Sequence, residues 1–526
     1  MKYFDFHAHI LLKQLFEDNP NVDSEISQGD VGLVPQLCSD LPYIIETQIH
    51  QSQLLSFQDQ TIVGAVLYGM ESFLAEVVEP LRDFLKQSSR NKLSKALLEA
   101  AKGANYSTFS TFTKDLTFDM YVNSPQYFNV LQKSSFDAPL PADKINLFFV
   151  IEGCHSLMNT LNRVPSPTSG YTAQEIISNL DGLRNVARIL SVNLTHLQQS
   201  NISNHAFGMQ IAEPAKFYPT GRGLTDEGLK VVQSLFDRNI CVDLKHMSYK
   251  SRKDLRSAID QGFFTNPQPL LCTHAGFTGT SFENWPKFIR VRKPVNPDVL
   301  YLEITKTKQI KNGPRQPGAP SFNMSTINLF DEEIVWIVKH GGMIGLSMDR
   351  RILGYVSKFD DHPTGLDAES PFMVDKEYFS RSEWQALQIG EIGEDGEINA
   401  DDRITMDDVI QSADSIPQRN KYFYAHVLFH IKHFLQTCIT GEIPLATAQK
   451  HLTIGSDFDG VINPFVNFQT CLDMPTLKHY IVTELGDFLR DLSDSREWAD
   501  QLDVPAFAED LFYNNGFEFV SKFFQT

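Results

Sequence analysis

Short apolar runs recur along the chain, and several of them follow a stretch whose apolar positions have helical spacing. Residues 176–186 carry apolar side chains three and four positions apart, which predicts an amphipathic helix. Thr172 and Glu175 stand at its start with the spacing of a capping box, and the apolar run 189–194 follows it as a predicted strand. This part of the chain therefore predicts a helix that leads into a buried strand.

The same unit of helix and strand recurs further along the chain. Thr225 is a predicted N-cap, with Asp226 and Glu227 at the positive end of the helix dipole, and that helix leads to an apolar run ending at His246. Repeated units of this kind predict a parallel sheet covered by helices. Similar units end at His274, Leu346 and Asp457.

Polar and reactive residue types collect at the carboxyl ends of these predicted strands, which is where barrel enzymes carry their chemistry. A doubly wound sheet would need a Gly-rich phosphate-binding turn, and we find none in the sequence. The predicted fold class is therefore α/β, as a (β/α)8 TIM barrel. We expect a single barrel over residues 1–526, with helical or loop insertions at about 45–140, 277–325 and 352–420.

Composition and charge narrow the class of protein. The 526 residues are 42% apolar and include 39 Phe, as in a globular protein with a large core. A net charge of −19 argues against general binding to nucleic acid or acidic membranes, which requires basic patches. The six cysteines have no short-spaced pair, which favours buried free thiols. Because residues 1–20 lack a signal-peptide pattern, a cytoplasmic protein is expected.

The chain begins with a pair of histidines two positions apart on a predicted first strand. Side chains alternate along a strand, so Asp5, His7 and His9 share one face while Phe4 and Phe6 share the other. Two imidazoles at the end of one strand can hold a metal ion from one side. Short His-x-His pairs also occur by chance, so the meaning of this pair depends on further ligands elsewhere.

Further candidate ligands stand at the ends of other predicted strands. Glu152 ends an apolar run, where a carboxylate is costly without a cationic partner, and a position between two cations would remove that cost. His246 and His274 would then hold the second ion, and His7 and His9 the first. Any one of these residues is more often a structural hydrogen-bonding group, but their recurrence at strand ends favours metal ligands for a hydrolytic reaction.

Six sequence blocks resemble, in the same order, the renal (membrane) dipeptidase family of metallopeptidases. These enzymes belong to the amidohydrolase superfamily and have a barrel with two zinc ions. The similar blocks cover about half of the chain, and the three insertions have no counterpart among them. The blocks are Ile151–Ser156, Leu194–His196, Gly223–Gly228, Val242–Ser248, Thr273-His274 and Ile454–Gly460.

The resemblance implies a role for each strand-end residue. His196 would contact the substrate and stabilise the oxyanion, and Asp457 would act as the general acid and base. Two divalent metal ions are implied, with Zn²⁺ as the expected metal, although His and carboxylate ligands also suit iron or manganese. The implied metal ligands are His7 and His9 at one ion, His246 and His274 at the other, and Glu152 between the two.

Two positions depart from the pattern of the family. The family usually has an aspartate where this chain has His9, so the site would lose one negative charge. The family has an arginine that binds the dipeptide carboxylate where this chain has Ile327. Lys245, Arg290 or Arg292 are candidates to replace that guanidinium, since carboxylate recognition needs a cationic donor.

The sequence thus predicts a metal-dependent hydrolase that cleaves an amide bond in a dipeptide or similar small molecule. A water or hydroxide shared by the two cations would attack the carbonyl, because binding to a metal lowers the pKa of water from about 15.7 to about 7. An alternative is an amidohydrolase-type enzyme for a lactam, lactone or N-acyl compound. A barrel that only binds a ligand is a third interpretation. No nucleic acid or membrane partner is expected, and a homodimer is compatible with the sequence.

Overall fold

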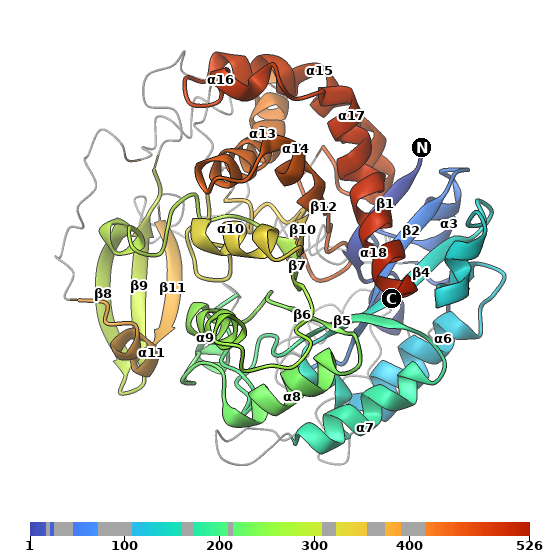
Figure 1. Ribbon diagram of the computed structural model, residues 1–526, viewed down its shortest axis with the longest axis horizontal. Helices are drawn as coiled ribbons and strands as arrows, with labels where there is room; N and C mark the ends of the chain where they lie inside the picture. The colour runs from blue at the N-terminus through green and yellow to red at the C-terminus, as the bar shows by residue number, and fades with distance from the viewer. Residues whose placement is uncertain are drawn as a thin grey trace, which may run out of the picture.

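Parallel strands form the centre of the molecule, hydrogen-bonded in the order β1-β2-β4-β5-β6-β7-β10-β12 (Figure 1). The computed structural model describes residues 1–16, 21–25, 46–71, 108–159, 172–208, 214–307, 322–354, 374–390, 403, 416–465 and 467–526. The strands are β1 (Tyr3–Ala8), β2 (Thr61–Tyr68), β4 (Ile145–Glu152), β5 (Ile189–Asn193), β6 (Cys241–Asp243), β7 (Leu270–Ala275), β10 (Met343–Leu346) and β12 (Leu452–Ile454).

The sheet closes on itself where the segment after β12 meets β1. The backbone N–H of Asp457 donates to the His7 carbonyl, and the N–H of His9 donates to the Phe458 carbonyl, both at 2.9 Å. Next to these bonds, the backbone N–H of Ser456 donates to Asp5 Oδ1 at 2.9 Å. These contacts join the first and last strands of the sheet, and the predicted (β/α)8 barrel is confirmed.

Helices surround the barrel, as Figure 1 shows. The predicted caps are present, because Thr172 Oγ1 accepts from the Glu175 N–H at 3.2 Å and Thr225 Oγ1 accepts from the Gly228 N–H at 3.0 Å. The helices are α3 (Gln51–Leu55), α6 (Asp119–Val122), α7 (Ala173–Arg184), α8 (Asp226–Phe236), α9 (Tyr249–Asp260), α10 (Asp331–Lys339), α11 (Arg381–Ala386), α13 (Ile416–Thr440), α14 (Leu445–Ala448), α15 (Met474–Asp491), α16 (Arg496–Ala499), α17 (Val504–Glu509) and α18 (Asn515–Gln525).

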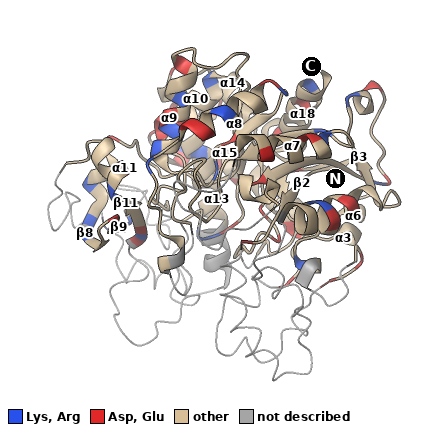
Figure 2. Ribbon diagram, turned by 90° about the horizontal axis from the view of Figure 1, so that it is seen from below, with Lys and Arg blue, Asp and Glu red and all other residues tan. Residues whose placement is uncertain are grey.

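Charged side chains lie mainly on the outer elements. Figure 2 shows Lys, Arg, Asp and Glu on helices such as α8, α9 and α10, whereas β2 carries none of them. Among the described helices, none combines the length and the apolar character that a bilayer-spanning segment requires.

The first predicted insertion, at about 45–140, contains a strand of the barrel itself. β2 pairs with β1 on one side and with β4 on the other, both in parallel, and all eight of its residues are buried. Its continuous apolar run is the signal of a strand covered on both faces. The prediction that this whole range is an insertion is therefore wrong. A short strand, β3 (Phe128–Val130), also lies in this range and pairs with β4.

The other two predicted insertions contribute to one small antiparallel sheet in the order β11-β9-β8. β8 (Ile289–Asn296) and β9 (Val299–Thr305) come from the second range, and β11 (Val374–Ser380) comes from the third. The sheet and α11 lie beside α9 and α10 at the left of Figure 1. An aromatic cluster packs at this sheet and includes Trp285, Phe330, Phe379 and Trp384.

The alternation predicted for β1 is interrupted, because its register with β2 shifts between Asp5 and Ala8. Phe4 and Phe6 pack against Phe148, with ring centroids 5.8 and 6.2 Å away. Asp5 and His7 are fully buried. The apolar side chains of β1 therefore contribute to the core, and His7 Nδ1 lies 2.9 Å from the Thr273 hydroxyl oxygen of β7. The five cysteines among the described residues are buried and free: Cys154, Cys241, Cys272, Cys438 and Cys471.

Candidate metal centre

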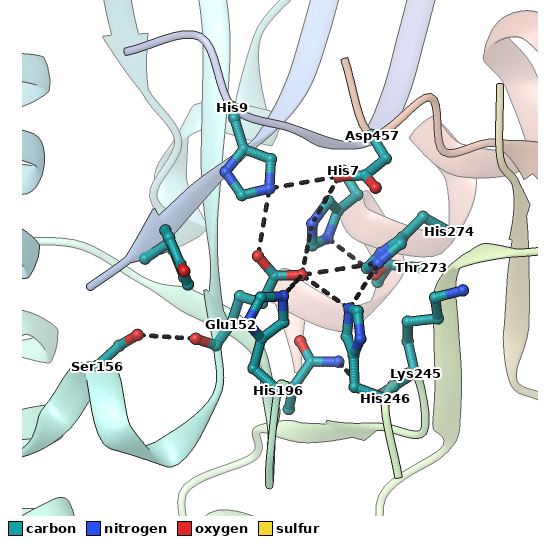
Figure 3. Close-up of polar contacts among 12 residues, drawn as sticks. His7, His9, Glu152, Ser156, His196, Lys245, His246, Thr273, His274 and Asp457 are labelled. Carbon is teal, nitrogen blue, oxygen red and sulfur yellow. Dashed lines mark hydrogen bonds and ion pairs between the residues drawn. The ribbon is translucent and has the colours of Figure 1, made fainter. Parts of the chain in front are cut away.

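The carboxylate of Glu152, at the end of β4, lies at the centre of a histidine cluster (Figure 3). Its Oε2 lies 3.2 Å from His9 Nε2. Its Oε1 lies 3.1 Å from His246 Nε2, 3.5 Å from His7 Nε2 and 3.6 Å from His274 Nε2. The structure thus brings the five predicted metal ligands together, and the two oxygens of one carboxylate face different imidazoles.

Asp457 and His196 complete the same cluster from two other sides. Asp457 Oδ1 lies 3.4 Å from His9 Nε2 and 3.9 Å from His7 Nε2. His196 Nε2 lies 3.7 Å from Glu152 Oε1. The predicted acid/base aspartate and the predicted oxyanion-binding histidine therefore stand on different sides of the Glu152 carboxylate.

The donor atoms of this cluster suit a divalent cation. The Nε2 atoms of His7 and His9 are buried and have no hydrogen-bond partner among the described residues. A buried polar atom without a partner costs about 1–3 kcal/mol, and a metal ion would remove that cost. Three groups of donors lie within 4.8 Å of one another, namely His7 with Glu152 and His274, His7 with His9 and Asp457, and Glu152 with His196 and His246.

Burial and charge push the pKa values of the histidines in opposite directions. Burial lowers the pKa of His9, but the Glu152 and Asp457 carboxylates outweigh burial and raise it to about 9. Burial, together with the neighbouring His196, lowers the pKa of His246 to about 3. Burial would raise the pKa of Glu152, but the adjacent histidines hold it well below its ordinary value. The ionised Glu152 carboxylate therefore lies beside a neutral His246, as metal ligation requires, whereas a metal ion bound to His9 would displace a proton from its ring.

One hydroxyl group fixes the tautomers of two of these histidines. The Thr273 hydroxyl donates its proton to Asp243 Oδ2, so its oxygen acts as an acceptor towards its other neighbours. His7 Nδ1 lies 2.9 Å and His274 Nδ1 lies 3.1 Å from that oxygen. Both rings therefore carry their proton on Nδ1 and direct the Nε2 lone pair to the centre, as expected for metal-binding histidines.

The backbone at the site has an unusual conformation. His246, Asp457, Asp459 and Val461 have φ values of 68°, 62°, 66° and 64°, in the left-handed region that non-glycine residues rarely adopt. Gly460 stands within this loop, where a Cβ atom would lie 2.1 Å from Asp457 Oδ1. Strained residues of this kind concentrate at functional sites, where the surrounding structure holds them in place.

A pocket of about 70 Å³ opens beside the cluster. This is several times the roughly 10–15 Å³ that one water needs. Lys245 lines the pocket, and its buried ammonium has no hydrogen-bond partner among the described residues. Arg290 and Arg292 lie on β8 and do not line it. Its apolar wall consists of Leu12, Leu197, Ile327, Ile352, Val461 and Ile462.

The structure adds site residues that the sequence does not single out. Glu71 accepts a hydrogen bond from His196 Nδ1 at 2.6 Å. Asp349 and Arg351 line the pocket as an ion pair, with 2.7 Å between Arg351 Nη2 and Asp349 Oδ2. Each of them follows the end of a barrel strand, β2 or β10, and this position is the signal that could have identified them.

No protein-family model matches the chain, and a search of curated proteins gives no match. Among solved structures, the chain is similar to a metallopeptidase from Rhodobacter sphaeroides liganded with a phosphinate mimic of the dipeptide L-Ala-D-Ala. That similarity covers 100% of this chain and 99% of that chain, at 12% identity and a TM-score of 0.48.

Two structures from Pseudomonas aeruginosa are also similar. The probable dipeptidase PvdM shares 12% identity over 100% of this chain and 95% of its own, with a TM-score of 0.49. An amidohydrolase shares 10% identity over 95% of this chain and 100% of its own, with a TM-score of 0.42. At these identities and TM-scores the comparisons assign no family to the chain.

Proposed function

We propose that this chain is a metal-dependent hydrolase that cleaves an amide bond in a dipeptide or a similar small molecule. The observation that supports this most directly is that the Glu152 carboxylate lies within 3.6 Å of the Nε2 atoms of four histidines, His7, His9, His246 and His274. His7 and His9 would hold one divalent ion, His246 and His274 would hold a second, and Glu152 would contribute to both. Zn²⁺ is the expected metal, because imidazole and carboxylate are its common ligands.

Ions bound there would activate a water and polarise the substrate carbonyl. In our proposal Asp457 takes the proton of the attacking water and returns it to the leaving amine, and its place beside His9 and His7 suits this role. His196 Nε2 is directed to the side of Glu152 away from Asp457, where it would stabilise negative charge on the carbonyl oxygen.

Lys245 is the residue that we propose to bind the substrate. Its ammonium is buried, lines the pocket and has no hydrogen-bond partner among the described residues. Burial lowers the pKa of Lys245, and an anionic group of the substrate would compensate the charge of its protonated form. A carboxylate near the scissile amide fits this position.

A second candidate is hydrolysis of a lactone, a lactam or an N-acyl compound without a free carboxylate. This candidate is favoured by Ile327, which faces the pocket with an apolar side chain and is 4% exposed. The cytoplasmic location and the absence of a nucleic acid partner remain predictions from the sequence.

Metal analysis combined with a substrate panel tests the proposal. We expect the purified protein to contain about two divalent ions per chain, and to hydrolyse dipeptides or N-acyl amino acids in a reaction that a chelator abolishes. Asp457→Asn should lower turnover by roughly 10²–10⁴-fold while metal content is retained. A protein that neither binds metal nor hydrolyses any amide or lactone would overturn the proposal.

A further inference from the structure

We propose that Glu71 is a positioning residue for His196, which holds the imidazole in the orientation required for hydrolysis. This inference rests on the proposed function and adds to it a carboxylate that lies outside the predicted ligand set. Glu71 stands three positions beyond the end of β2, at Tyr68. It approaches His196 from the side opposite to Glu152.

The contact between Glu71 and His196 is short and buried. Glu71 Oε1 accepts from His196 Nδ1 at 2.6 Å, and the Glu71 side chain is fully buried, with 0% exposure. A hydrogen bond from a ring N–H to a carboxylate is about twice as strong as a neutral one. Glu71 therefore binds the proton on Nδ1 and favours the protonated ring, in which Nε2 also carries a proton that can be donated to the proposed oxyanion.

Neighbouring groups hold Glu71 in place. The Tyr68 hydroxyl donates to Glu71 Oε2, so the two carboxylate oxygens have different partners. The Tyr68 ring meets the His196 ring edge-on, with centroids 5.1 Å apart. His155 Nε2 lies 2.7 Å from the Gly69 carbonyl, which fixes His155 at 3.6 Å from Glu71 Oε1. The carboxylate and the ring beside it therefore have little freedom to rotate.

With Nδ1 bound to Glu71, the opposite nitrogen of His196 points to the proposed reaction centre. Nε2 lies 3.7 Å from Glu152 Oε1, and His196 lines the same pocket as Lys245 and Asp457. Without Glu71, the ring could flip and Nδ1 would lose its acceptor. Loss of the partner that orients a ligand or catalytic imidazole typically costs about 10–100-fold in affinity or activity.

Two substitutions of Glu71 distinguish a role in orienting the His196 ring from a role in the stability of the fold. In Glu71→Leu we expect kcat to fall about 10–100-fold with KM nearly unchanged, because the interaction is used in the reaction more than in binding. Glu71→Gln should recover most of the activity, since its amide oxygen can still accept from Nδ1. Metal content should match that of wild type, and Glu484→Leu, at an exposed position of α15, is the matched control.

A double-mutant cycle tests whether Glu71 acts through His196. In a His196→Ala background, adding Glu71→Leu should reduce kcat by less than about 2-fold, because interacting residues are not additive. A full additional loss would show that Glu71 acts in another way and would overturn the proposal. Equal activity of wild type and Glu71→Leu would also overturn it.

A measurement that does not depend on activity distinguishes this inference from the proposed function. With ¹⁵N-labelled histidine, the protein should show a slowly exchanging proton on His196 Nδ1 that disappears in Glu71→Leu and persists in Glu71→Gln. If the protein hydrolyses nothing, the proposed function fails, while this signal still decides whether Glu71 orients the ring. An unchanged Nδ1 proton in Glu71→Leu would refute the positioning role.

Discussion

The hydroxyl of Thr273 influences two candidate metal ligands at once. It donates to Asp243 and lies within hydrogen-bond distance of Nδ1 of both His7 and His274. These histidines come from β1 and β7, and the proposed function assigns them to different ions. A side chain that binds no metal itself can therefore set the affinity for metal at both positions.

Thr273→Val removes this hydroxyl with little change in volume. We expect affinity for divalent metal to fall about 10–100-fold, because both imidazoles lose the acceptor that fixes their tautomer. Titration with Zn²⁺ in the presence of a competing chelator measures the change. Thr483→Val on the exposed face of α15 is the control, and equal affinities of the two variants would contradict the role of Thr273.

A second prediction for a single side chain concerns Lys245 and the recognition of a substrate carboxylate. Lys245→Met should raise KM about 10–100-fold for substrates with a free carboxylate, since a hydrogen bond to a charged group contributes roughly 1.5–3 kcal/mol. The KM for the matching neutral amide should stay within about 2-fold. The melting temperature should not fall, because the substitution removes a buried charge without a hydrogen-bond partner among the described residues. An equal rise in KM for both substrates would argue against carboxylate recognition.

Among the helices, α9 and α10 are joined by a buried ion pair that also supports the site. Arg252 Nε and Nη2 donate to the two oxygens of Glu333, each at 2.8 Å. The same guanidinium donates to the carbonyl of Met247, next to His246, and to that of Thr326, next to Ile327. One arginine therefore connects two helices with the loop that carries the candidate ligand His246 and with the wall of the pocket.

Arg252→Met should lower the free energy of unfolding by about 3–5 kcal/mol, because Glu333 would remain as a buried charge with its main partner removed. Urea denaturation followed by circular dichroism measures this loss. Lys253→Met, at the exposed neighbouring position, should change stability by less than about 0.5 kcal/mol. Adding Glu333→Leu to Arg252→Met should restore part of the stability, and a further large loss would contradict this account.

The stability of the folded protein should depend on pH through Glu377, which lies on β11 of the small sheet. Burial raises the pKa of Glu377 to about 8, although its Oε2 accepts from the Thr326 N–H at 2.6 Å. The folded protein then keeps this proton to a higher pH than the unfolded chain, whose carboxyl ionises near pH 4.3. Ionisation therefore costs stability as pH rises from about 4.5 to about 8.

Glu377→Gln should remove this dependence. Relative to the variant, wild type should lose up to about 1.4 kcal/mol of unfolding free energy per pH unit over this window. Urea denaturation of both proteins at pH 5, 6, 7 and 8 tests the slope. A constant difference across these pH values would show that Glu377 does not titrate as its burial implies.

The elements that the sequence predicts correctly are those with a local signal. β7 and β10 coincide with the apolar runs that end at His274 and Leu346. Thr172 and Thr225 cap the expected helices. The pairing of β9 with β11 joins segments about 70 residues apart, and no local pattern specifies such a pair. The structure therefore corrects the predicted insertions mainly where distant segments pair.

The same reasoning applies to the site residues. Glu152 and His274 were identifiable because a polar residue at the end of a buried strand requires a partner. Glu71 and Arg351 lie a few residues after the ends of β2 and β10. At such positions the sequence does not distinguish a charged site residue from an ordinary loop residue. Only the folded arrangement shows that Glu71 reaches His196 and that Arg351 lines the pocket.

For the whole molecule, the donor groups of the candidate site come from most of the barrel. They belong to β1, β4 and β7 and to the segments that follow β1, β5, β6 and β12. An ion bound there would connect parts of the chain that are up to 450 residues apart in sequence, from His7 to Asp457. Metal binding should therefore stabilise the entire barrel rather than one loop.

Chelation followed by thermal unfolding tests this coupling. A ligand present at about 1,000 times its Kd stabilises the folded state by about 4 kcal/mol, so removal of metal should lower the melting temperature by several degrees. Re-addition of Zn²⁺ should restore it. Asp494→Asn, on the exposed surface, should respond as wild type does, whereas His246→Ala should show a much smaller shift. An unchanged melting temperature after complete metal removal would contradict the proposed site.

The backbone bonds that join His7 and His9 to Asp457 and Phe458 also affect how the protein can be made in the cell. During synthesis Asp457 emerges 450 residues after His7. A nascent chain would therefore carry most of the proposed metal ligands long before the barrel can close around them. Closure over such a distance is slow to form, so the protein should bind the proposed ions only after β12 has left the ribosome.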